Sequence, residues 1–245
     1  MLEGKVVVVT GAGSGLGRAL CQAFHAQGSI VVGVGRTAGS LEETGQSLGH
    51  ERYSWETADV ANPAQVEHAV ANIIERHSRI DYLFNNAAVY HKVGFLEETP
   101  EQWAQTIAIN VNGPANCCKA VLPHMLNNGF GRIFNVGSFT DYAPIPESAA
   151  STVSKGALHA LSKGIVADLA THDADIEIHE WTPGHLNTQM SDFTGIDPAI
   201  SAGWAVGLAQ RPPSERKALL FENDHEVLPP KGLKQRILDK LLFRK

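Results

Sequence analysis

The sequence predicts a doubly wound α/β fold, with a parallel sheet of about seven strands and helices on both faces of the sheet. Apolar runs of strand length alternate along the chain with longer segments of helical periodicity. The first run, Val6–Val9, is continuously apolar, as expected of a parallel strand that is buried on both sides. A glycine-rich turn follows this strand and leads into a helical pattern that begins at Arg18.

The other elements follow in order from the same periodicities. A second buried strand is predicted at Ile30–Val34. The segment from Asn62 to His77 has apolar residues at helical spacing, and Asn62-Pro63 supplies a capping residue followed by proline at the first helical position. Further elements are strands near Tyr82–Asn85, Arg132–Val136, Ile176–Glu180 and Ala218–Phe221, and helices over about Glu101–Asn127 and Thr152–Thr171.

Composition limits the functional classes. The 245 residues are 43% hydrophobic and 19% charged, without a Pro/Gly-rich linker or a repeat, so we expect one domain over residues 1–245. The net charge of -6 argues against nucleic acid as a partner, because phosphate binding needs clustered Lys and Arg. Three cysteines without a pairing pattern indicate a reducing compartment, and the apolar run at the N-terminus is too short to span a membrane. We therefore expect a cytoplasmic protein.

The turn after the first strand reads Thr10-Gly11-Ala12-Gly13-Ser14-Gly15-Leu16-Gly17. Glycines here let the chain turn sharply and bring backbone N–H groups close to a pyrophosphate at a helix N-terminus. A tight turn without a ligand would need the same residues. Its position between a buried strand and a helix favours a dinucleotide site of the Rossmann type.

Further motifs follow in a fixed order over nearly the whole chain. They are Asp59-Val60, Asn85-Asn86-Ala87-Ala88, Asn110 in Ile-Asn-Val-Asn-Gly, Ser138 after a strand, and Pro183-Gly184-His185-Leu186-Asn187-Thr188. With the T-G-x-x-x-G-x-G turn, they resemble the short-chain dehydrogenase/reductase family. The resemblance implies hydride transfer between a nicotinamide cofactor and the carbonyl/alcohol group of a small-molecule substrate. Family members are usually homodimers or homotetramers, so a homo-oligomer is expected here.

The resemblance also implies roles for individual residues. Asn110, Ser138 and Lys155 would form the catalytic group, with Lys155 also holding the nicotinamide ribose. The cofactor would lie against Gly11, Ser14, Gly15, Leu16, Gly17, Asp59, Val60, Asn86, Ala87, Pro183, Gly184 and Thr188.

The end of the second strand bears on the choice between NAD and NADP. An acidic residue there would hold the ribose hydroxyls of NAD. The sequence instead has Gly35 followed by Arg36, and a guanidinium suits a 2′-phosphate. We therefore expect NADP(H) to be preferred over NAD(H), although Arg36 would also suit a solvated loop and no basic residue stands inside the glycine turn.

The tyrosine that normally supplies the acid is missing. In the resembling family it lies thirteen residues after the serine and four before the lysine, and here Ser151 stands at that position between Ser138 and Lys155. Residues at i and i+4 share one helix face, so position 151 and Lys155 can act on one site. A serine hydroxyl is a much poorer acid than a tyrosine, and it reaches less far.

Three interpretations stay open. The protein can be a reductase with another acid or with water in the vacated space, Tyr142 being the nearest replacement in sequence and Tyr90, His91 and His185 weaker candidates. It can be a 2,4-dienoyl/enoyl-type reductase of a conjugated C=C bond that uses Tyr142. It can also be a catalytically silent NADP-binding sensor or scaffold, and an engineered tyrosine-to-serine knockout would have the same sequence.

The last third of the chain sets the surroundings of the site. The segment from Gln189 to about Leu208 follows the motif that precedes the substrate loop in the family, and its apolar residues suit either an apolar substrate or helix packing. Residues 231–245 form a basic amphipathic pattern that suits peripheral contact with an anionic membrane, although we expect this helix to dock on its own domain or on a neighbouring subunit. The sequence contains no closely spaced pair of histidines of the kind that binds a metal ion, so we expect no metal site.

Overall fold

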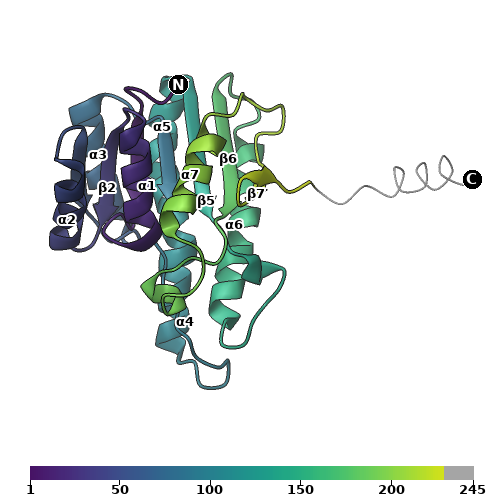
Figure 1. Cartoon of the computed structure of the whole chain (residues 1–245). Coiled ribbons are helices and arrows are strands. Elements are labelled where there is room, and N and C mark those ends of the chain that lie inside the picture. The colour runs from purple at the N-terminus through teal and green to yellow at the C-terminus, as the bar shows by residue number, and fades with distance from the viewer. Residues whose placement is uncertain (229–245) are drawn as a thin grey trace, which may run out of the picture.

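The computed structural model describes residues 1–228, in which strands and helices alternate (Figure 1). The strands are β1 (Val6–Thr10), β2 (Ile30–Gly35), β3 (Tyr53–Thr57), β4 (Tyr82–Asn85), β5 (Phe130–Val136), β6 (Asp175–Thr182), β7 (Leu220–Glu222) and β8 (His225–Glu226). The α-helices are α1 (Gly15–Ala26), α2 (Ala38–Leu48), α3 (Pro63–His77), α4 (Pro100–Ile107), α5 (Gly113–Asn127), α6 (Ala149–Asp168) and α7 (Pro198–Ala209). Short helical turns are η1 (Ala108–Asn112), η2 (Phe139–Asp141) and η3 (Gln189–Ser191).

The strands form one sheet in the order β3-β2-β1-β4-β5-β6-β7-β8, and only the β7–β8 pair is antiparallel. The sheet grows outward in both directions from β1, so the strand order reverses between β1 and β4. This topology confirms the predicted doubly wound α/β fold. The sheet has eight strands rather than about seven, because the two residues of β8 extend its edge.

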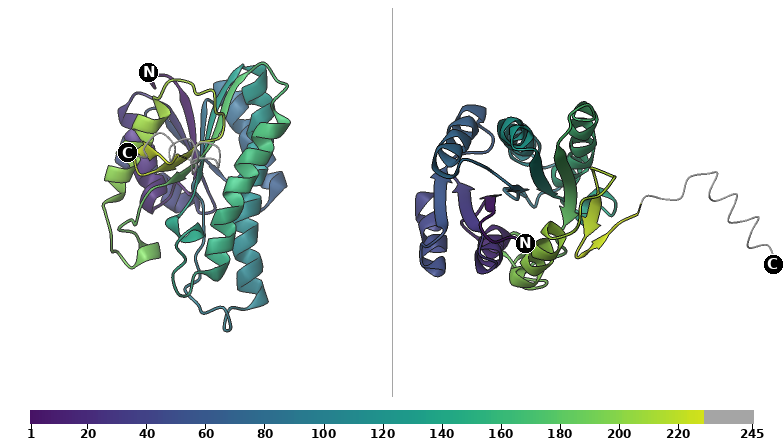
Figure 2. Two further views of the ribbon diagram at one scale, coloured as in Figure 1. Left: turned by 90° about the vertical axis from the view of Figure 1, so that its right-hand side faces the viewer. Right: turned by 90° about the horizontal axis from the view of Figure 1, so that it is seen from above.

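Helices cover both faces of the sheet (Figure 2, right). Helices α1, α2 and α7 lie on one face and α3, α5 and α6 on the other, and the buried side chains form a separate cluster on each face. The side chains of β1 alternate between them, Val7 and Val9 joining the first cluster and Val6 and Val8 the second. This explains why β1 has no polar face in its sequence.

Local sequence signals account for the starts of several helices. The Asn62 side chain accepts a hydrogen bond from the Gln65 backbone N–H at 3.2 Å, and Pro63 begins α3 as predicted. Thr99 and Gln102 form a capping box at the start of α4.

The predicted helix from Glu101 to Asn127 is present but not uniform. It comprises α4, the π-helical turn η1 and α5. Sequence reasoning missed this turn, and it also missed α2, β3 and α7, whose apolar patterns are weak or irregular. The predicted helix Thr152–Thr171 begins three residues earlier, at Ala149, and the predicted strand at Ala218–Phe221 is shifted to Leu220–Glu222.

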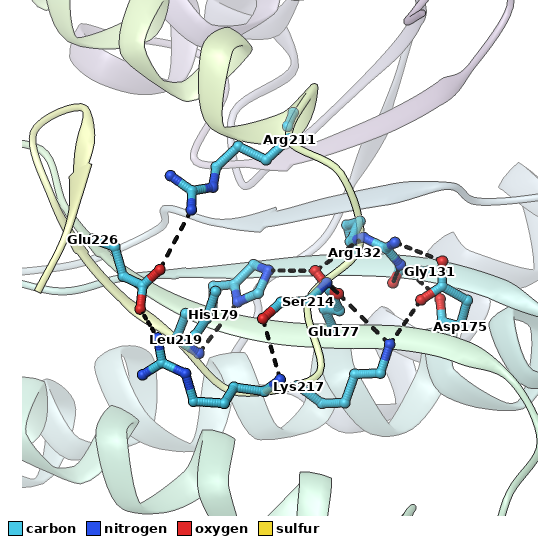
Figure 3. A network of polar contacts seen from close by, with 12 residues as sticks. Gly131, Arg132, Asp175, Glu177, His179, Arg211, Ser214, Lys217, Leu219 and Glu226 are labelled. Atoms are coloured by element: carbon cyan, nitrogen blue, oxygen red, sulfur yellow. Dashed lines mark hydrogen bonds and ion pairs between the residues drawn. The ribbon is translucent and has the colours of Figure 1, made fainter. Parts of the chain in front are cut away.

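The end of the sheet where β5 and β6 begin holds a network of charged residues (Figure 3). The Arg132 guanidinium contacts Asp175 Oδ2 at 2.7 Å and Glu177 Oε2 at 3.3 Å, and Arg132 and Glu177 are both buried. His179 Nε2 lies 3.1 Å from the same Glu177 oxygen, while the Leu219 backbone N–H donates to His179 Nδ1. Because Nδ1 accepts, the ring proton is on Nε2 and His179 is neutral.

No helix among residues 1–228 is long and apolar enough to cross a membrane. The same part of the chain contains no cluster of three or more His, Cys, Asp or Glu residues arranged to hold a metal ion. The predicted basic helix at 231–245 lies outside the described residues.

Candidate active site

The predicted site residues gather where the parallel strands end. The glycine turn follows β1, Arg36 follows β2, Asn86 follows β4 and Ser138 closely follows β5. Since neighbouring parallel strands end at the same edge of a sheet, topology alone brings these segments together, beside the point where the strand order reverses.

Close packing inside the turn requires its glycines. A Cβ atom on Gly17 would lie 2.1 Å from the Gly11 carbonyl oxygen, and one on Gly11 would lie 3.0 Å from the Ala87 Cα. Gly11 also has a φ of +68°, a conformation that disfavours other residues. The turn is anchored on β2, where the Gly11 backbone N–H donates to the Val34 carbonyl oxygen at 2.8 Å.

The N-terminus of α1 leaves donors available to a ligand. The first-turn N–H groups of Gly15, Leu16 and Gly17 have no partner within the helix, and Ser14 forms no side-chain cap on them. These backbone groups fit the pyrophosphate of a dinucleotide, which needs close approach and N–H donors. Thr188 lies over the same turn, its Cγ2 being 3.3 Å from where a Cβ of Gly15 would stand.

Asn86 holds the glycine turn onto β4. Its side-chain amide donates to the Thr10 carbonyl oxygen at 2.8 Å, and the backbone N–H groups of Asn86 and Ala87 donate to Thr10 Oγ1 at 3.0 Å. The resemblance implies that Asn86 also lies against the cofactor. In this structure its side-chain amide holds the glycine turn.

The predicted residues of the adenosine end lie around β2 and β3. Arg36 is exposed and forms no ion pair with any residue among 1–228. The Asp59 carboxylate accepts a hydrogen bond from the Ala61 backbone N–H at 2.9 Å, and Val60 is buried against Gly113. Arg36 is therefore the predicted residue of this end whose charge is free to meet a ligand.

Asn110 is fixed on the π-helical turn η1. Its amide nitrogen donates to the Val89 carbonyl oxygen at 2.9 Å and to Ser154 Oγ at 3.1 Å, and its oxygen accepts from the Val89 backbone N–H at 2.9 Å. Such turns distort a helix locally and are frequent at functional sites. Here the turn connects the loop after β4 with α6.

Lys155 is buried beside the end of β5. Its ammonium donates to the Val136 carbonyl oxygen at 2.7 Å, two residues before Ser138. Burial lowers the pKa of Lys155 to about 8, against an opposing attraction from Glu180. Ser138 Oγ accepts from Thr140 Oγ1 at 3.1 Å, and Ser151 lies one helical turn before Lys155 in α6. Helix α6 and the end of β5 thus bring Ser138, Ser151 and Lys155 to one place.

The hydroxyl group of Tyr142 is bound to β7. Its hydroxyl donates to Glu222 Oε1 of β7 at 3.0 Å, and the side chain is largely exposed. Partial burial of the hydroxyl and the Glu222 carboxylate raise the pKa of Tyr142 to about 12. This environment makes the tyrosine a weaker acid near neutral pH.

The loop after β6 closes one side of the site. Pro183 and Gly184 are tied to α7, where Ser201 Oγ donates to the Pro183 carbonyl oxygen at 2.9 Å. An ion pair between Lys92 and Asp192 joins this loop to the loop after β4. Apolar side chains on the loop and on the start of α7 are exposed, namely Met190, Phe193 and Ile200.

Two of the three weaker candidates for an acid are hydrogen-bonded to other side chains. His91 Nε2 lies 3.0 Å from Gln105 Oε1, and His185 Nε2 lies 2.8 Å from Thr194 Oγ1. Partial burial raises the pKa of Tyr90.

Sequence reasoning missed a group of titratable residues below the site. Glu180 of β6 is buried against His159 of α6, with Lys155 of α6 and Asp141 of η2 nearby. The apolar pattern of β6 identified the strand without revealing that one of its inward positions carries a carboxyl group.

Gly17→Ala tests the packing of the turn. We expect it to lower the free energy of unfolding by roughly 1–3 kcal/mol, because the new methyl group meets backbone oxygen rather than a movable side chain. The matched control is Gly207→Ala in α7, which meets nothing within 4 Å and should be neutral or stabilising. Urea denaturation of both variants measures the difference, and equal stabilities would contradict this packing.

Comparison with known proteins agrees with this arrangement. Residues 5–197 match the model of a family described as short chain dehydrogenase. A curated relative, 2-(R)-hydroxypropyl-CoM dehydrogenase of Xanthobacter autotrophicus, is 37% identical over 202 residues, which cover 80% of each chain. Dehydrogenase/reductase SDR family member 7B of Bos taurus is 32% identical over 198 residues, covering 78% of this chain and 60% of the relative.

Solved structures are similar over most of the chain. A 3-ketoacyl-(acyl-carrier-protein) reductase from Brucella melitensis complexed with NADH has a TM-score of 0.83 and 25% identity, covering 91% of this chain and 98% of its own. A metagenomic short-chain oxidoreductase in complex with NADP has a TM-score of 0.79 and 26% identity, covering 90% and 97%.

Proposed function

Since this chain belongs to the short-chain dehydrogenase family, we propose that it is an NADP-preferring oxidoreductase acting on a carbonyl/alcohol pair. Its relatives are named dehydrogenases and oxidoreductases, and similar structures contain NADH or NADP. The observation that carries the proposal is the convergence of the glycine turn, Ser138 and buried Lys155 at one edge of the sheet.

A nicotinamide cofactor, when bound, supplies or accepts the hydride. We assign its pyrophosphate to the free N–H groups at the start of α1 and its 2′-phosphate to Arg36. Asp59, Val60, Asn86 and Ala87 would line the adenosine side, and Pro183, Gly184 and Thr188 the nicotinamide side. Lys155 would hold the nicotinamide ribose.

The protein's own residues orient the substrate and move the proton. In this proposal Ser138 donates a hydrogen bond to the substrate oxygen, and Asn110 fixes the loop after β4 against α6. Ser151 occupies the place of the family's tyrosine and is too weak an acid to replace it. Lys155, with a pKa of about 8, is largely protonated at neutral pH and supplies the proton through the Ser151 hydroxyl or water.

Reduction of a C=C bond with Tyr142 as the acid gains no support from the placement of that tyrosine, whose hydroxyl binds Glu222. A silent NADP-binding protein has one specific observation in its favour, the serine at position 151. The two remaining functions differ in turnover and not in cofactor binding.

The test is binding and oxidation of NADPH. Fluorescence titration should show NADPH binding, and a panel of ketones, aldehydes and enones should include a carbonyl compound that drives NADPH oxidation. Binding without turnover would favour the silent function. Failure to bind either NADPH or NADH would refute both.

Arg36→Leu tests the preference for NADP. We expect the affinity for NADPH to fall roughly 10- to 100-fold, because a hydrogen bond to a charged phosphate contributes about 1.5–3 kcal/mol. The affinity for NADH, which lacks the 2′-phosphate, is the internal control and should change little. An equal loss of affinity for NADPH and NADH would mean that Arg36 does not bind the 2′-phosphate.

We also propose that the substrate is a small molecule and that the protein forms a homo-oligomer, as family members typically do. The exposed apolar residues of the loop after β6 favour a substrate with an apolar portion. Light scattering of the purified protein would test the assembly.

A further inference from the structure

The carboxyl group of Glu180 has no ordinary structural role. Glu180 lies near the end of β6 and is 1% exposed, and neither of its carboxyl oxygens has a hydrogen-bond partner within residues 1–228. A buried charge without hydrogen bonds is costly, so such a group needs an explanation. Its Oε1 lies only 2.6 Å from where a Cβ of Gly137 would stand, so the glycine leaves the space that the carboxyl group fills.

This position brings Glu180 beneath the site. Gly137 immediately precedes Ser138, and the carbonyl of the preceding residue, Val136, is the oxygen that Lys155 contacts at 2.7 Å. The carboxyl group of Glu180 and the ammonium of Lys155 therefore approach adjacent residues at the end of the same strand.

A path from this pair to the surface follows one face of α6. Lys155, His159 and Lys163 are spaced four residues apart, so they lie one above another on the helix. His159 Nδ1 lies 3.3 Å from Glu180 Oε2, and its side chain is 44% exposed. His159 therefore touches both the buried carboxyl group and solvent.

The charges around Glu180 suit exchange of a proton near neutral pH. Burial and the neighbouring Asp141 raise the pKa of Glu180 to about 7, against the attraction of Lys155 and Lys163. Burial lowers the pKa of Lys155 to about 8 and also lowers that of His159. The groups that face Glu180 are thus Lys155, His159 and Lys163 from α6 and Asp141 from η2.

We propose that Glu180 and His159 form a proton relay that connects Lys155 with solvent. The relay rests on the proposed function, because it resupplies the proton that Lys155 transfers toward the substrate oxygen. Glu180 acts only through Lys155, so it is a positioning residue for that proton rather than a catalytic residue.

Each proton that leaves a group of the relay is replaced by another. In the direction of reduction, Lys155 loses a proton toward the substrate oxygen. Its neutral amine regains one from the carboxylic acid of Glu180 through a bridging water, because Lys155 and Glu180 form no direct hydrogen bond or ion pair. The resulting carboxylate takes a proton from the His159 imidazolium, which regains one from water. Every step reverses for oxidation, and no electron moves through these residues.

The test combines Glu180→Gln, which keeps the size of the side chain and removes its titration, with His159→Asn at the surface. The first readout is the titration of Lys155 in the free protein, followed by NMR of lysine labelled with ¹³C at Cε. We expect Lys155 to titrate at a pH lower by about one unit or more in Glu180→Gln, because an attractive charge is lost.

The second readout is turnover of an active carbonyl substrate as a function of pH. Both variants should lose about tenfold in kcat at pH 7, less than the 10²–10⁴-fold typical of an acid that contacts the reacting atoms. Added imidazole should partly restore His159→Asn, because a small buffer can replace the missing surface carrier.

Glu177→Gln is the matched control, since it removes another buried carboxyl group from β6 at a place remote from Lys155. It should leave the Lys155 titration and the pH profile unchanged, even if it lowers stability. An unchanged Lys155 titration in Glu180→Gln, or a native pH profile in both relay variants, would overturn the relay. Absence of turnover in the native protein would refute the proposed function, whereas the Lys155 titration would still decide whether Glu180 and Lys155 are coupled.

Discussion

Ser151→Tyr is expected to raise kcat for reduction of a carbonyl substrate by roughly 10²-fold, the lower end of the 10²–10⁴-fold that a positioned acid contributes. A phenol at position 151 would project from the first turn of α6 toward the place served by Ser138, with Lys155 one turn further along. The Lys155 cation would lower the pKa of the phenol from its usual value of about 10 and make it a stronger acid.

The matched control is Ser151→Phe, which adds the same ring without the hydroxyl group. NADPH oxidation should rise only in the tyrosine variant, and NADPH affinity should stay similar in the native protein and both variants. If the tyrosine variant is no faster than the native protein, the native site already has an effective acid. If only the tyrosine variant turns over, the native protein is a silent cofactor-binding protein.

These outcomes also bear on the relay below the site. A tyrosine would deliver its proton directly to the substrate, while Lys155, Glu180 and His159 would still replenish it from solvent. Glu180→Gln should therefore lower turnover in the Ser151→Tyr background as well. A loss confined to the native background would mean that Glu180 matters only where serine replaces the acid.

The fold and the outline of the site were predictable because local sequence signals carry them. Val6–Val9 is apolar at every position because its side chains enter two different hydrophobic clusters. The glycines of the next turn are required by close contacts of the turn. Parallel strands then bring the ends of β1, β4 and β5 to a common edge, so residues far apart in sequence could be assigned to one site.

Other features depend on contacts that no local pattern records. Tyr142 follows Ser138 closely in sequence, yet its hydroxyl binds Glu222 on another strand. Glu180 occupies one position of an otherwise predictable strand, and its neighbours come from α6 and η2. The side chain of Asn86, which the resemblance places against the cofactor, also holds the glycine turn through Thr10. Three-dimensional packing decides each of these cases.

Arg132→Met is expected to lower the free energy of unfolding at pH 7 by roughly 3–5 kcal/mol, the usual cost of removing one partner from a buried ion pair. The substitution retains most of the apolar stem but leaves Glu177 buried without the guanidinium that contacts it at 3.3 Å (Figure 3). Asp175 loses its contact at 2.7 Å as well, although this partly exposed carboxylate can turn to water.

Arg216→Met is the matched control, because Arg216 pairs with Glu226 at the surface of the same network and is half exposed. It should cost no more than about 1 kcal/mol. Urea denaturation compares the two variants, and equal losses would mean that the buried cation does not hold the network together.

The same network predicts how stability depends on pH. Hydrogen bonds from His179 and Ser214 and the charge of Arg132 hold the pKa of Glu177 below its usual value despite burial. Its contribution is therefore complete above the unfolded pKa of about 4.5 and is lost as the pH falls through the lower folded value. Burial lowers the pKa of His179, so protonation of the unfolded chain begins to reduce stability already below about pH 6.5. Unfolding measured from pH 8 to pH 4 should show both losses of stability in the native protein, the one due to His179 and, at lower pH, the one due to Glu177. Arg132→Met should make the loss due to Glu177 smaller, because it raises the pKa of Glu177 in the folded protein.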